Sequence, residues 1–266
     1  SDQIGSDFSY NVGINGAYNK NKVGNIPTED GIIHGDVNML YDNSPEFYRA
    51  ENGHAIGYFW GYQTAGIFQN KEQIANWNAD GKHGILQSDP QPGDVIYVDQ
   101  NQDGIIDDND KVDLGNGTPD FTYGFNLGFN YKNFDFSFFV VGFHGFDIYN
   151  ATHQMGYNLI KSQQMAGGTP MRELLNRWTP TNTNTDIPGF VKGGTENKDF
   201  FSTRFVENGS FIKMKSITLG YTLPEATCRS LGINNLRVYA SVQNPFHITK
   251  YSGLDPEATM GSPLVQ

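Results

Sequence analysis

The chain has 266 residues, of which 37% are hydrophobic, 14% aromatic and 18% charged, and its formal net charge is −11. Few charges with many aromatic, glycine and asparagine residues indicate strands and turns, and exclude a coiled coil, a helical bundle and a disordered tail. The acidic balance argues against nucleic acid as a partner, because phosphate binding needs a basic surface. No apolar run is long enough for a transmembrane helix, but this composition does not exclude a membrane barrel.

Apolar and polar residues alternate along the first part of the chain, which predicts β-strands. The first predicted strand covers Asp7–Tyr18, and a weaker one lies near Gly31–Leu40. A third covers Ile56–Tyr62, where Ile56 begins a run of aromatic residues on one face. The polar stretch Asn70–Lys82 then predicts a short surface helix that ends at a glycine.

Residues 99–110 match a calcium loop of the D-x-[DN]-x-D-G type. Ca²⁺ prefers six to eight hard oxygen ligands, and this spacing wraps such oxygens around one point, while Gly104 permits the sharp turn. The aspartate at the last position is shorter than the usual glutamate, and the preceding residues look extended, so we expect a structural site and not an EF-hand sensor. The predicted ligands are Asp99, Asn101, Asp103, the Ile105 carbonyl, Asp107 and Asp110.

The loop lies in the most acidic part of the chain. Between Asp94 and Asp120 there are eight acidic residues and a single base, Lys111. This concentration favours a cation site over a generally acidic surface. The alternative is an acidic turn held by hydrogen bonds from side chains to the backbone, without a metal.

The clearest strand pattern covers residues 122–143. In Thr122–Tyr131, tyrosine, phenylalanine and leucine alternate strictly with threonine, glycine and asparagine. The alternation resumes after Lys132-Asn133, which predicts a hairpin. Two further strands are predicted at Phe211–Leu223 and Leu236–Val242.

The predicted strands are longer than usual for soluble proteins and match the roughly 9–11 residues of a tilted membrane strand. An apolar face with tyrosines at both ends and a polar opposite face fits a barrel wall with lipid outside and a polar lumen inside. A soluble sandwich with one face on its core has the same alternation.

The polar connection Asn150–Thr203 is long, and such stretches are usually functional loops. It contains a second predicted helix at Met171–Trp178. Barrels carry their long loops on the external side, so we expect an external loop here.

The sequence provides little support for an enzyme. The six histidines have no metal-binding spacing, and there is no phosphate-binding glycine loop and no nucleophile elbow. The single cysteine, Cys228, excludes an internal disulfide and a cysteine-based zinc site.

Motifs along the whole chain resemble the late barrel of SusC-like TonB-dependent outer-membrane transporters (the SusC/RagA kind). The resemblance is carried first by residues 94–150, which run from the acidic loop through the predicted hairpin. Further matches are DFSYNVGINGAYNKNKV at 7–23, GYFWGYQTAGIFQNKEQI at 57–74, LLNRWTPTNTNTDIP at 174–188, RFVENGSFIKMKSITLGYTLP at 204–224 and LRVYASVQNPFHITKYSGLDPE at 236–257.

The resemblance implies an all-β fold: an antiparallel segment, residues 1–266, of a 22-stranded transmembrane β-barrel with long external loops and short loop helices. It implies import of oligosaccharides or peptides across the bacterial outer membrane, with a SusD-like surface lipoprotein as lid and TonB acting through a plug domain. The plug and the last strand of the family are not found here, so the rest of the barrel and outer-membrane lipid are further expected partners. A soluble, calcium-stabilised β-sandwich that binds glycans is the alternative reading.

Overall fold

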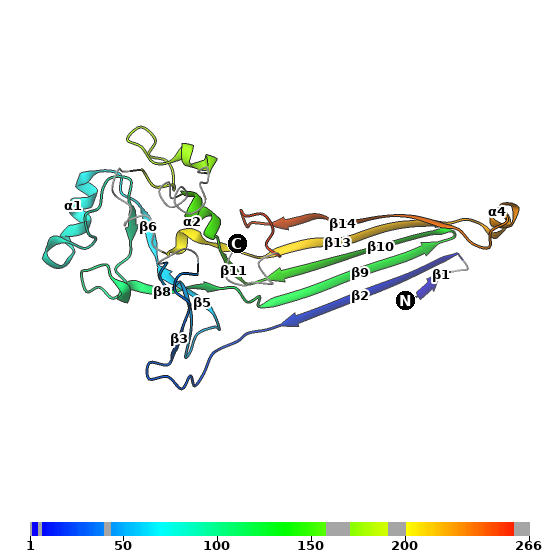
Figure 1. Ribbon diagram of the computed structural model, residues 1–266, viewed down its shortest axis with the longest axis horizontal. Coiled ribbons are helices and arrows are strands. Elements are labelled where there is room, and N and C mark those ends of the chain that lie inside the picture. Colours follow the sequence, from blue (N-terminus) through cyan, green and yellow to red (C-terminus); the bar gives the residue numbers. More distant parts are fainter. Residues whose placement is uncertain (1, 5–6, 40–43, 158–170, 191–200, 258–266) are drawn as a thin grey trace. The chain divides into compact units, whose positions relative to one another are not determined.

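The computed structural model describes residues 2–4, 7–39, 44–157, 171–190 and 201–257 (Figure 1). The chain divides into two compact units. The sheet unit consists of Ser1–Lys20, Thr118–Phe146 and Asn208–Tyr251. The core unit consists of Asn21–Gly117, Asp147–Glu207 and Ser252–Gln266. None of the helices in the described ranges is both long and apolar enough to cross a membrane.

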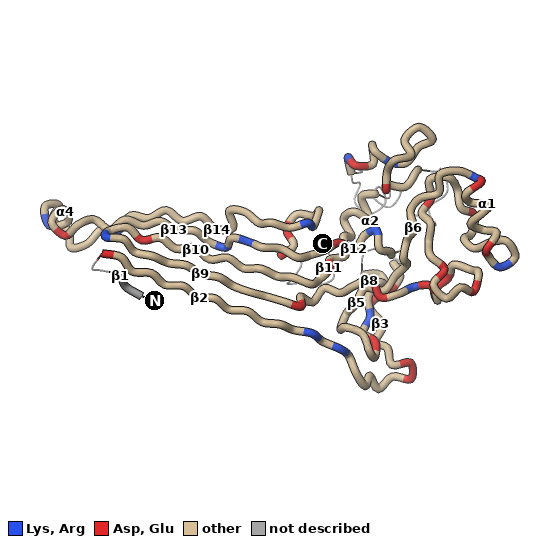
Figure 2. The backbone as a smooth tube through the Cα atoms, turned by 180° about the vertical axis from the view of Figure 1, so that it is seen from behind, with Lys and Arg blue, Asp and Glu red and all other residues tan. Residues whose placement is uncertain are grey.

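The sheet unit is one six-stranded sheet in the order β1-β2-β9-β10-β13-β14, with every neighbouring pair antiparallel. Figure 2 shows that charged residues are sparse along its long strands. A short helix, α4 (Glu225–Ser230), lies in the connection between the last two strands. The strands are β1 (Asp2–Ile4), β2 (Phe8–Tyr18), β9 (Phe121–Tyr131), β10 (Phe134–His144), β13 (Phe211–Thr222) and β14 (Arg237–Thr249).

The predicted hairpin is confirmed as β9 and β10. They are joined by a two-residue loop, and Lys132 has a positive φ of 53°, as tight hairpin turns require. The register places Leu127 opposite Phe138, and Val12 of β2 opposite Leu127. Residues that face each other across these ladders lie on the same side of the sheet, so the apolar positions form one continuous face.

A β-bulge extends this apolar face into the start of β13. The register shifts between Met214 and Ser216, which leaves Lys215 as an extra residue. Met214 pairs with Val140 and Ile217 with Phe138, so both lie on the apolar face despite their odd spacing. Such an extra residue changes which face the following side chains occupy. Strict alternation in the sequence misses this change.

The opposite, polar face is built from glycines and asparagines that face each other across strands. Gly13 pairs with Asn126 and Asn15 with Gly124. A methyl group added at Gly13 would lie 2.2 Å from Asn126 Oδ1, so the asparagine side chain occupies the space above the glycine. A side chain at Gly13 would have to displace the asparagine, so glycine and asparagine pack together across neighbouring strands.

The core unit contains three small sheets and most of the short helices. Its sheets have the orders β3-β4-β5-β8, β6-β7 and β11-β12. Its strands are β3 (Ile32–His34), β4 (Tyr48–Glu51), β5 (Tyr58–Tyr62), β6 (Thr64–Ile67), β7 (Val95–Tyr97), β8 (Lys111–Asn116), β11 (Asp147–Tyr149) and β12 (Val206–Asn208). The boundary between the units falls within β12, whose last residue, Asn208, belongs to the sheet unit. Its α-helices are α1 (Lys71–Ala79) and α2 (Ala151–Tyr157).

Several local predictions change in this unit. The strands expected at 31–40 and 56–62 exist as the shorter β3 and β5, and they pair in the small sheet instead of the long one. The helix expected at 70–82 is confirmed as α1, which Asn70 caps by accepting a hydrogen bond from the Gln73 amide. The helix expected at 171–178 is a 3₁₀ segment, Arg172–Asn176. Helix α2 was not predicted, and residues 158–170 and 191–200 of the long connection lie outside the described residues.

Aromatic side chains form the interior of the core unit. Phe47, Phe59 and Tyr149 are at most 2% exposed, and the ring of Phe201 stacks on Phe47 with centroids 5.0 Å apart. A further cluster joins Tyr62, Val95 and Tyr97. β5 is buried along nearly its whole length, so its aromatic alternation reflects burial on both faces.

Candidate functional site

The polar face of the long sheet carries an ion pair that bridges three strands. Asp135 of β10 accepts two hydrogen bonds from the Arg237 guanidinium of β14, at 2.9 and 2.6 Å. The pair passes over Gly220 of the intervening β13, where an added methyl group would lie 2.4 Å from Asp135 Oδ1. A side chain at Gly220 would have to displace this ion pair, which adds charge to a face otherwise rich in Asn, Ser and Thr.

The predicted calcium loop, residues 99–110, connects β7 to β8 in the core unit. The extended segment predicted before the loop is confirmed as β7. Gly104 has φ of +82° and donates its amide hydrogen bond to Asp99 Oδ2 at 2.9 Å. The loop ends in a 3₁₀ turn, Asp108–Asp110, capped by Asp107.

Most of the predicted ligand side chains accept hydrogen bonds from the loop backbone. Asn101 Oδ1 accepts from the Asp103 amide at 2.8 Å, and Asp103 Oδ1 from the Ile105 amide at 3.0 Å. Asp107 Oδ1 accepts from the Asn109 amide at 2.8 Å. Within the described ranges, no three His, Cys, Asp or Glu side chains are gathered as a metal-holding group. Calcium binding therefore stays a prediction for this loop.

Asp110 is the most enclosed acid of the loop. Its side chain is fully buried, and its two oxygens accept hydrogen bonds from the Gln100 and Asp107 amides at 2.8 and 2.7 Å. Burial raises the pKa of Asp110, the amide hydrogen bonds oppose that shift, and the charge of Asp99 adds to it. Asp99 Oδ1 is itself buried without a hydrogen-bond partner. The carboxylates of Asp99 and Asp110 thus each have at least one oxygen shielded from water.

Just outside the predicted ligand set, Asp108 binds a lysine. Its Oδ1 lies 2.8 Å from Lys111 Nζ and accepts a hydrogen bond from the Tyr62 hydroxyl at 3.2 Å. The hydrogen bond from Lys111 lowers the pKa of Asp108. This pair accounts for the one base in the acidic segment.

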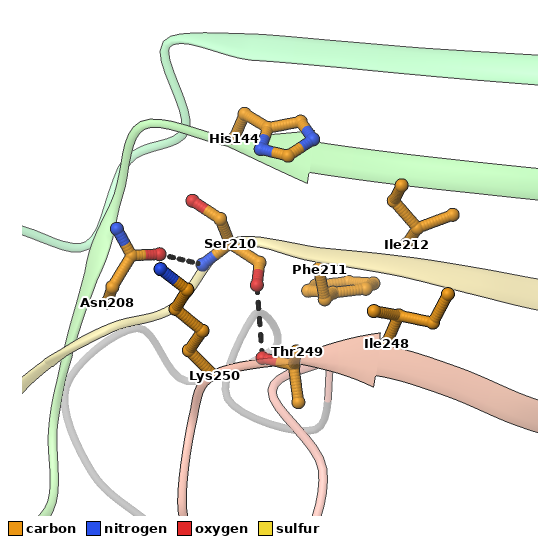
Figure 3. Close-up of a pocket in the computed structure, with 8 residues that line it drawn as sticks. All are labelled: His144, Asn208, Ser210, Phe211, Ile212, Ile248, Thr249 and Lys250. Atoms are coloured by element: carbon orange, nitrogen blue, oxygen red, sulfur yellow. Dashed lines mark hydrogen bonds between the residues drawn. The ribbon is translucent and has the colours of Figure 1, made fainter.

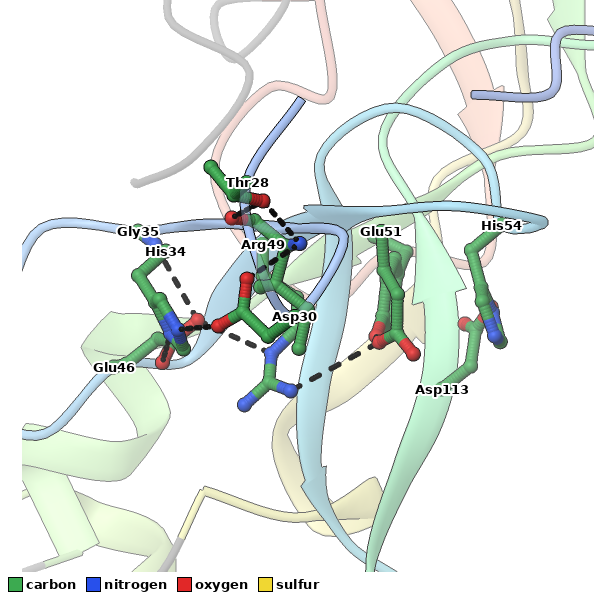
Figure 4. Close-up of polar contacts among 11 residues, drawn as sticks. Thr28, Asp30, His34, Gly35, Glu46, Arg49, Glu51, His54 and Asp113 are labelled. Atoms are coloured by element: carbon green, nitrogen blue, oxygen red, sulfur yellow. Dashed lines mark hydrogen bonds and ion pairs between the residues drawn. The ribbon is translucent and has the colours of Figure 1, made fainter. Parts of the chain in front are cut away.

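A second polar cluster, around β3, β4 and β5, escaped sequence analysis because its residues are scattered (Figure 4). Arg49 lies between Glu46, at 3.1 Å, and Glu51, at 3.9 Å, and its guanidinium stacks over the Trp60 ring at 3.7 Å. His34 Nδ1 lies 2.8 Å from Glu46, and this hydrogen bond raises the pKa of the histidine. The cluster ties strands β3, β4 and β5 together through these contacts.

A third cluster centres on the carboxylate of Glu207. It accepts hydrogen bonds from Asn150 Nδ2 at 2.7 Å and from the amide and hydroxyl of Ser252, both at 2.8 Å, and it pairs with His153 at 3.3 Å. Burial alone would raise the pKa of Glu207, but these hydrogen bonds outweigh it and lower the pKa to about 2. Because the Ser252 hydroxyl donates to Glu207, this Ser–His–Glu grouping does not activate a nucleophile.

The core unit also has a polar pocket of about 640 Å³. Arg204 lines it and donates a hydrogen bond to the Asp186 carbonyl at 3.1 Å. Burial lowers the pKa of this arginine. Five of the other nine lining residues, Asn176, Thr183, Asn184, Thr185 and Asp186, belong to the predicted external loop.

Comparison with protein-family models gives no match. The chain is 33% identical over 258 residues to TonB-dependent receptor P3 of Formosa agariphila, covering 95% of the chain and 23% of the relative. It is 27% identical over 264 residues to TonB-dependent receptor SusC of Bacteroides thetaiotaomicron, covering 97% of the chain and 23% of the relative. The chain belongs to the SusC-like TonB-dependent receptors. It spans about a quarter of the length of these relatives.

The fold agrees with this family. A solved structure of the RagAB peptide transporter matches 97% of the chain and 25% of its own length, with a TM-score of 0.68 and 22% identity. The RagAB peptide importer in the open-open state matches with a TM-score of 0.65 and 24% identity. The predicted all-β fold, a segment of an antiparallel barrel with few helices, is confirmed. The curated relatives are named as receptors and not as enzymes.

Proposed function

We propose that this chain forms part of the wall and the outer loops of a TonB-dependent transporter in the bacterial outer membrane. The observation that carries the proposal is the six-stranded sheet, whose long strands have 11 to 13 residues. One face is apolar and the other is mainly polar, with Phe139, Val141 and Phe143 of β10 as exceptions. A tilted strand needs about 9–11 residues to cross a bilayer. Open sheet edges are not tolerated in lipid, so β1 and β14 pair with further strands of a larger barrel.

The two faces of the sheet have different roles in the proposed barrel wall. The apolar face, which includes Val12, Leu127 and Phe138, contacts lipid, and aromatic residues lie toward both of its ends. The polar face, with its Asn/Gly pairs and the Asp135–Arg237 ion pair, lines the lumen. Polar, uncharged groups offer hydrogen bonds to a passing hydrophilic solute without holding it tightly.

Oligosaccharides or peptides are the proposed cargo, taken up with a SusD-like surface lipoprotein as lid and with TonB as energy-coupling partner. The support is the relationship to SusC and to the RagAB peptide importer. We propose that the connection 150–203 lies on the external side of the membrane, where it would face the lid. Long loops lie on the external side of such barrels.

The loop 99–110 is proposed to bind one Ca²⁺ in a structural role. Its support is the ligand spacing together with the poorly solvated pair Asp99 and Asp110, whose repulsion a dication would remove. Small rotations of the aspartate side chains would turn oxygens from the loop amides toward a shared ion.

The transport proposal is tested with the full-length receptor in its native host. A deletion strain should lose uptake of one labelled class, oligosaccharide or peptide, and a plasmid copy should restore it only when TonB is present. The receptor should also need detergent to stay in solution. A protein that is monodisperse in plain buffer would favour the alternative, a soluble glycan-binding sandwich.

A further inference from the structure

A pocket of about 340 Å³ lies at the end of the long sheet, entirely within the sheet unit (Figure 3). It is formed where β10 and β14 end and β13 begins. Its size falls within the range of small-molecule sites. Its lining residues are His144, Asn208, Ser210, Phe211, Ile212, Ile248, Thr249 and Lys250.

The register assigns part of this pocket to the apolar face. Ile212 pairs with Ile248, two residues beyond the pair Met214 and Phe246, so the apolar band continues into the pocket. The Ile248 side chain is 64% exposed, which is what we expect of an apolar side chain that faces lipid in the assembled barrel. Lys250 follows at the next position with the same parity, just past the end of β14.

The polar side of the pocket presents hydrogen-bond donors. In Figure 3, Lys250 points toward Asn208 and Ser210, and His144 lines the same pocket from the end of β10. Asn208 Oδ1 is occupied by the Ser210 amide at 2.9 Å, which leaves its Nδ2 as a donor. Ser210 Oγ accepts from the Gly145 amide at 3.2 Å, which leaves its proton to donate. Among the described residues, Lys250 forms no ion pair.

In the proposed membrane location of the sheet, the pocket lies at the level where the strands leave the hydrocarbon. At this end of the apolar face, the Tyr123 ring stacks on His144 with centroids 5.8 Å apart, and Tyr18 and Phe121 pair nearby. Aromatic girdles mark the interfacial level of barrels, and lysines reach from there to lipid headgroups. The strands at this end lead into the long connections 21–117 and 147–207, which marks it as the outer end.

We propose that this pocket binds the phosphate-bearing headgroup of an outer-leaflet lipid. Lys250, Asn208 and Ser210 would hold the phosphate, while an acyl chain would lie along Ile212 and Ile248. Basic pockets beside membrane-spanning elements bind such headgroups, and charge-assisted hydrogen bonds to phosphate are strong. The inference rests on the proposed membrane location of the sheet.

The test uses the full-length receptor in detergent with a photoreactive phosphatidic acid, and a photoreactive diacylglycerol of equal chain length for comparison. Phosphatidic acid should label the segments around Ile212 and Ile248 more strongly than diacylglycerol. Lys250→Gln should reduce that labelling roughly fivefold, the worth of one basic residue near an anionic surface. Lys250→Arg should retain it, and Lys132→Gln, an exposed lysine in the β9–β10 turn, should leave it unchanged.

Equal labelling by both lipids, or no effect of Lys250→Gln, would overturn the proposal. Loss of labelling in excess inorganic phosphate would assign the site to a free anion and overturn the lipid source. If Lys250→Gln fails to fold, the comparison of the two lipids on the wild-type receptor decides. A wild-type receptor that needs no detergent would instead contradict the membrane function itself.

Discussion

The two units of this chain bury their apolar residues in opposite ways. In the core unit, Phe47 is completely buried and packs on other aromatic rings. In the sheet unit, Ile14 is 77% exposed and Leu219 52%, although both lie on a continuous apolar face. A core excludes water by itself, whereas a face of this kind needs an apolar solvent. Under the proposed function, this contrast corresponds to a core unit surrounded by water and a sheet unit surrounded by lipid.

The largest effect is expected in the core unit. Phe47→Ala removes a fully buried ring and leaves a cavity, which should cost about 3–5 kcal/mol. Amide hydrogen exchange of the full-length receptor should show lost protection around residues 44–62. The matched change Ile14→Ala creates no cavity and should cost much less. Equal losses for the two variants would remove the contrast between the units.

A charge on the apolar face should have the next largest effect. Leu127→Arg places a guanidinium in mid-sheet and should cost about 2–4 kcal/mol if that position lies near the bilayer centre. The control is Ser137→Arg on the polar face, which should be tolerated because an arginine there meets the lumen. Folding into lipid vesicles, followed by the heat-dependent gel shift of barrels, measures both. Similar behaviour of the two variants would contradict the assignment of the faces.

A smaller effect is expected at Glu207. Because the pKa of Glu207 is lowered on folding, its carboxylate stabilises the fold fully above a pH of about 4.5, the ordinary pKa of a glutamate. That contribution falls as the pH drops toward about 2, the folded value. Glu207→Gln should cost about 1–2 kcal/mol at neutral pH, allowing for solvent screening, and should flatten the acid limb of the stability profile. An unchanged acid limb would show that another group sets it.

The smallest effect is local, in the loop 99–110. Ca²⁺ should slow hydrogen exchange there, Mg²⁺ should do so less, and neither should change the barrel's stability measurably. Asp103→Ala should abolish the calcium response, and Asp36→Ala, an exposed acid elsewhere in the core unit, should keep it. A loop that exchanges equally with and without calcium would support the metal-free acidic turn.

The sequence alone predicts a strand well where the pattern within that one strand determines which side chains are apolar. The alternation in β2, β9 and β10 predicted those strands nearly to their ends, because one face is apolar throughout. β14 extends to Thr249, well past the predicted end at Val242. The sequence misses this extension because Pro245 and the shifted register interrupt the alternation of apolar and polar residues. β5 has the same alternation as a barrel strand, and only its burial on both sides separates it.

The candidate sites also differ in whether their residues are consecutive or distant in the sequence. The loop 99–110 was visible because its residues are consecutive. The Glu207 cluster joins Asn150 and Ser252, which lie 57 and 45 residues away, and no local pattern marks it. The pocket around Lys250 depends on the β13 bulge that sets the face of Ile212. Sites assembled by long-range pairing therefore needed the three-dimensional structure.

The most direct test of the central claim is a spin-label scan along β9 of the full-length receptor in lipid bilayers, after Cys228→Ser. Collisions with oxygen, which is enriched in lipid, should peak at Tyr123, Phe125, Leu127 and Phe129. Collisions with a water-soluble nickel chelate should peak at the residues between them. Accessibility that does not alternate, or that alternates with the opposite phase, would contradict a lipid-facing apolar side of this sheet.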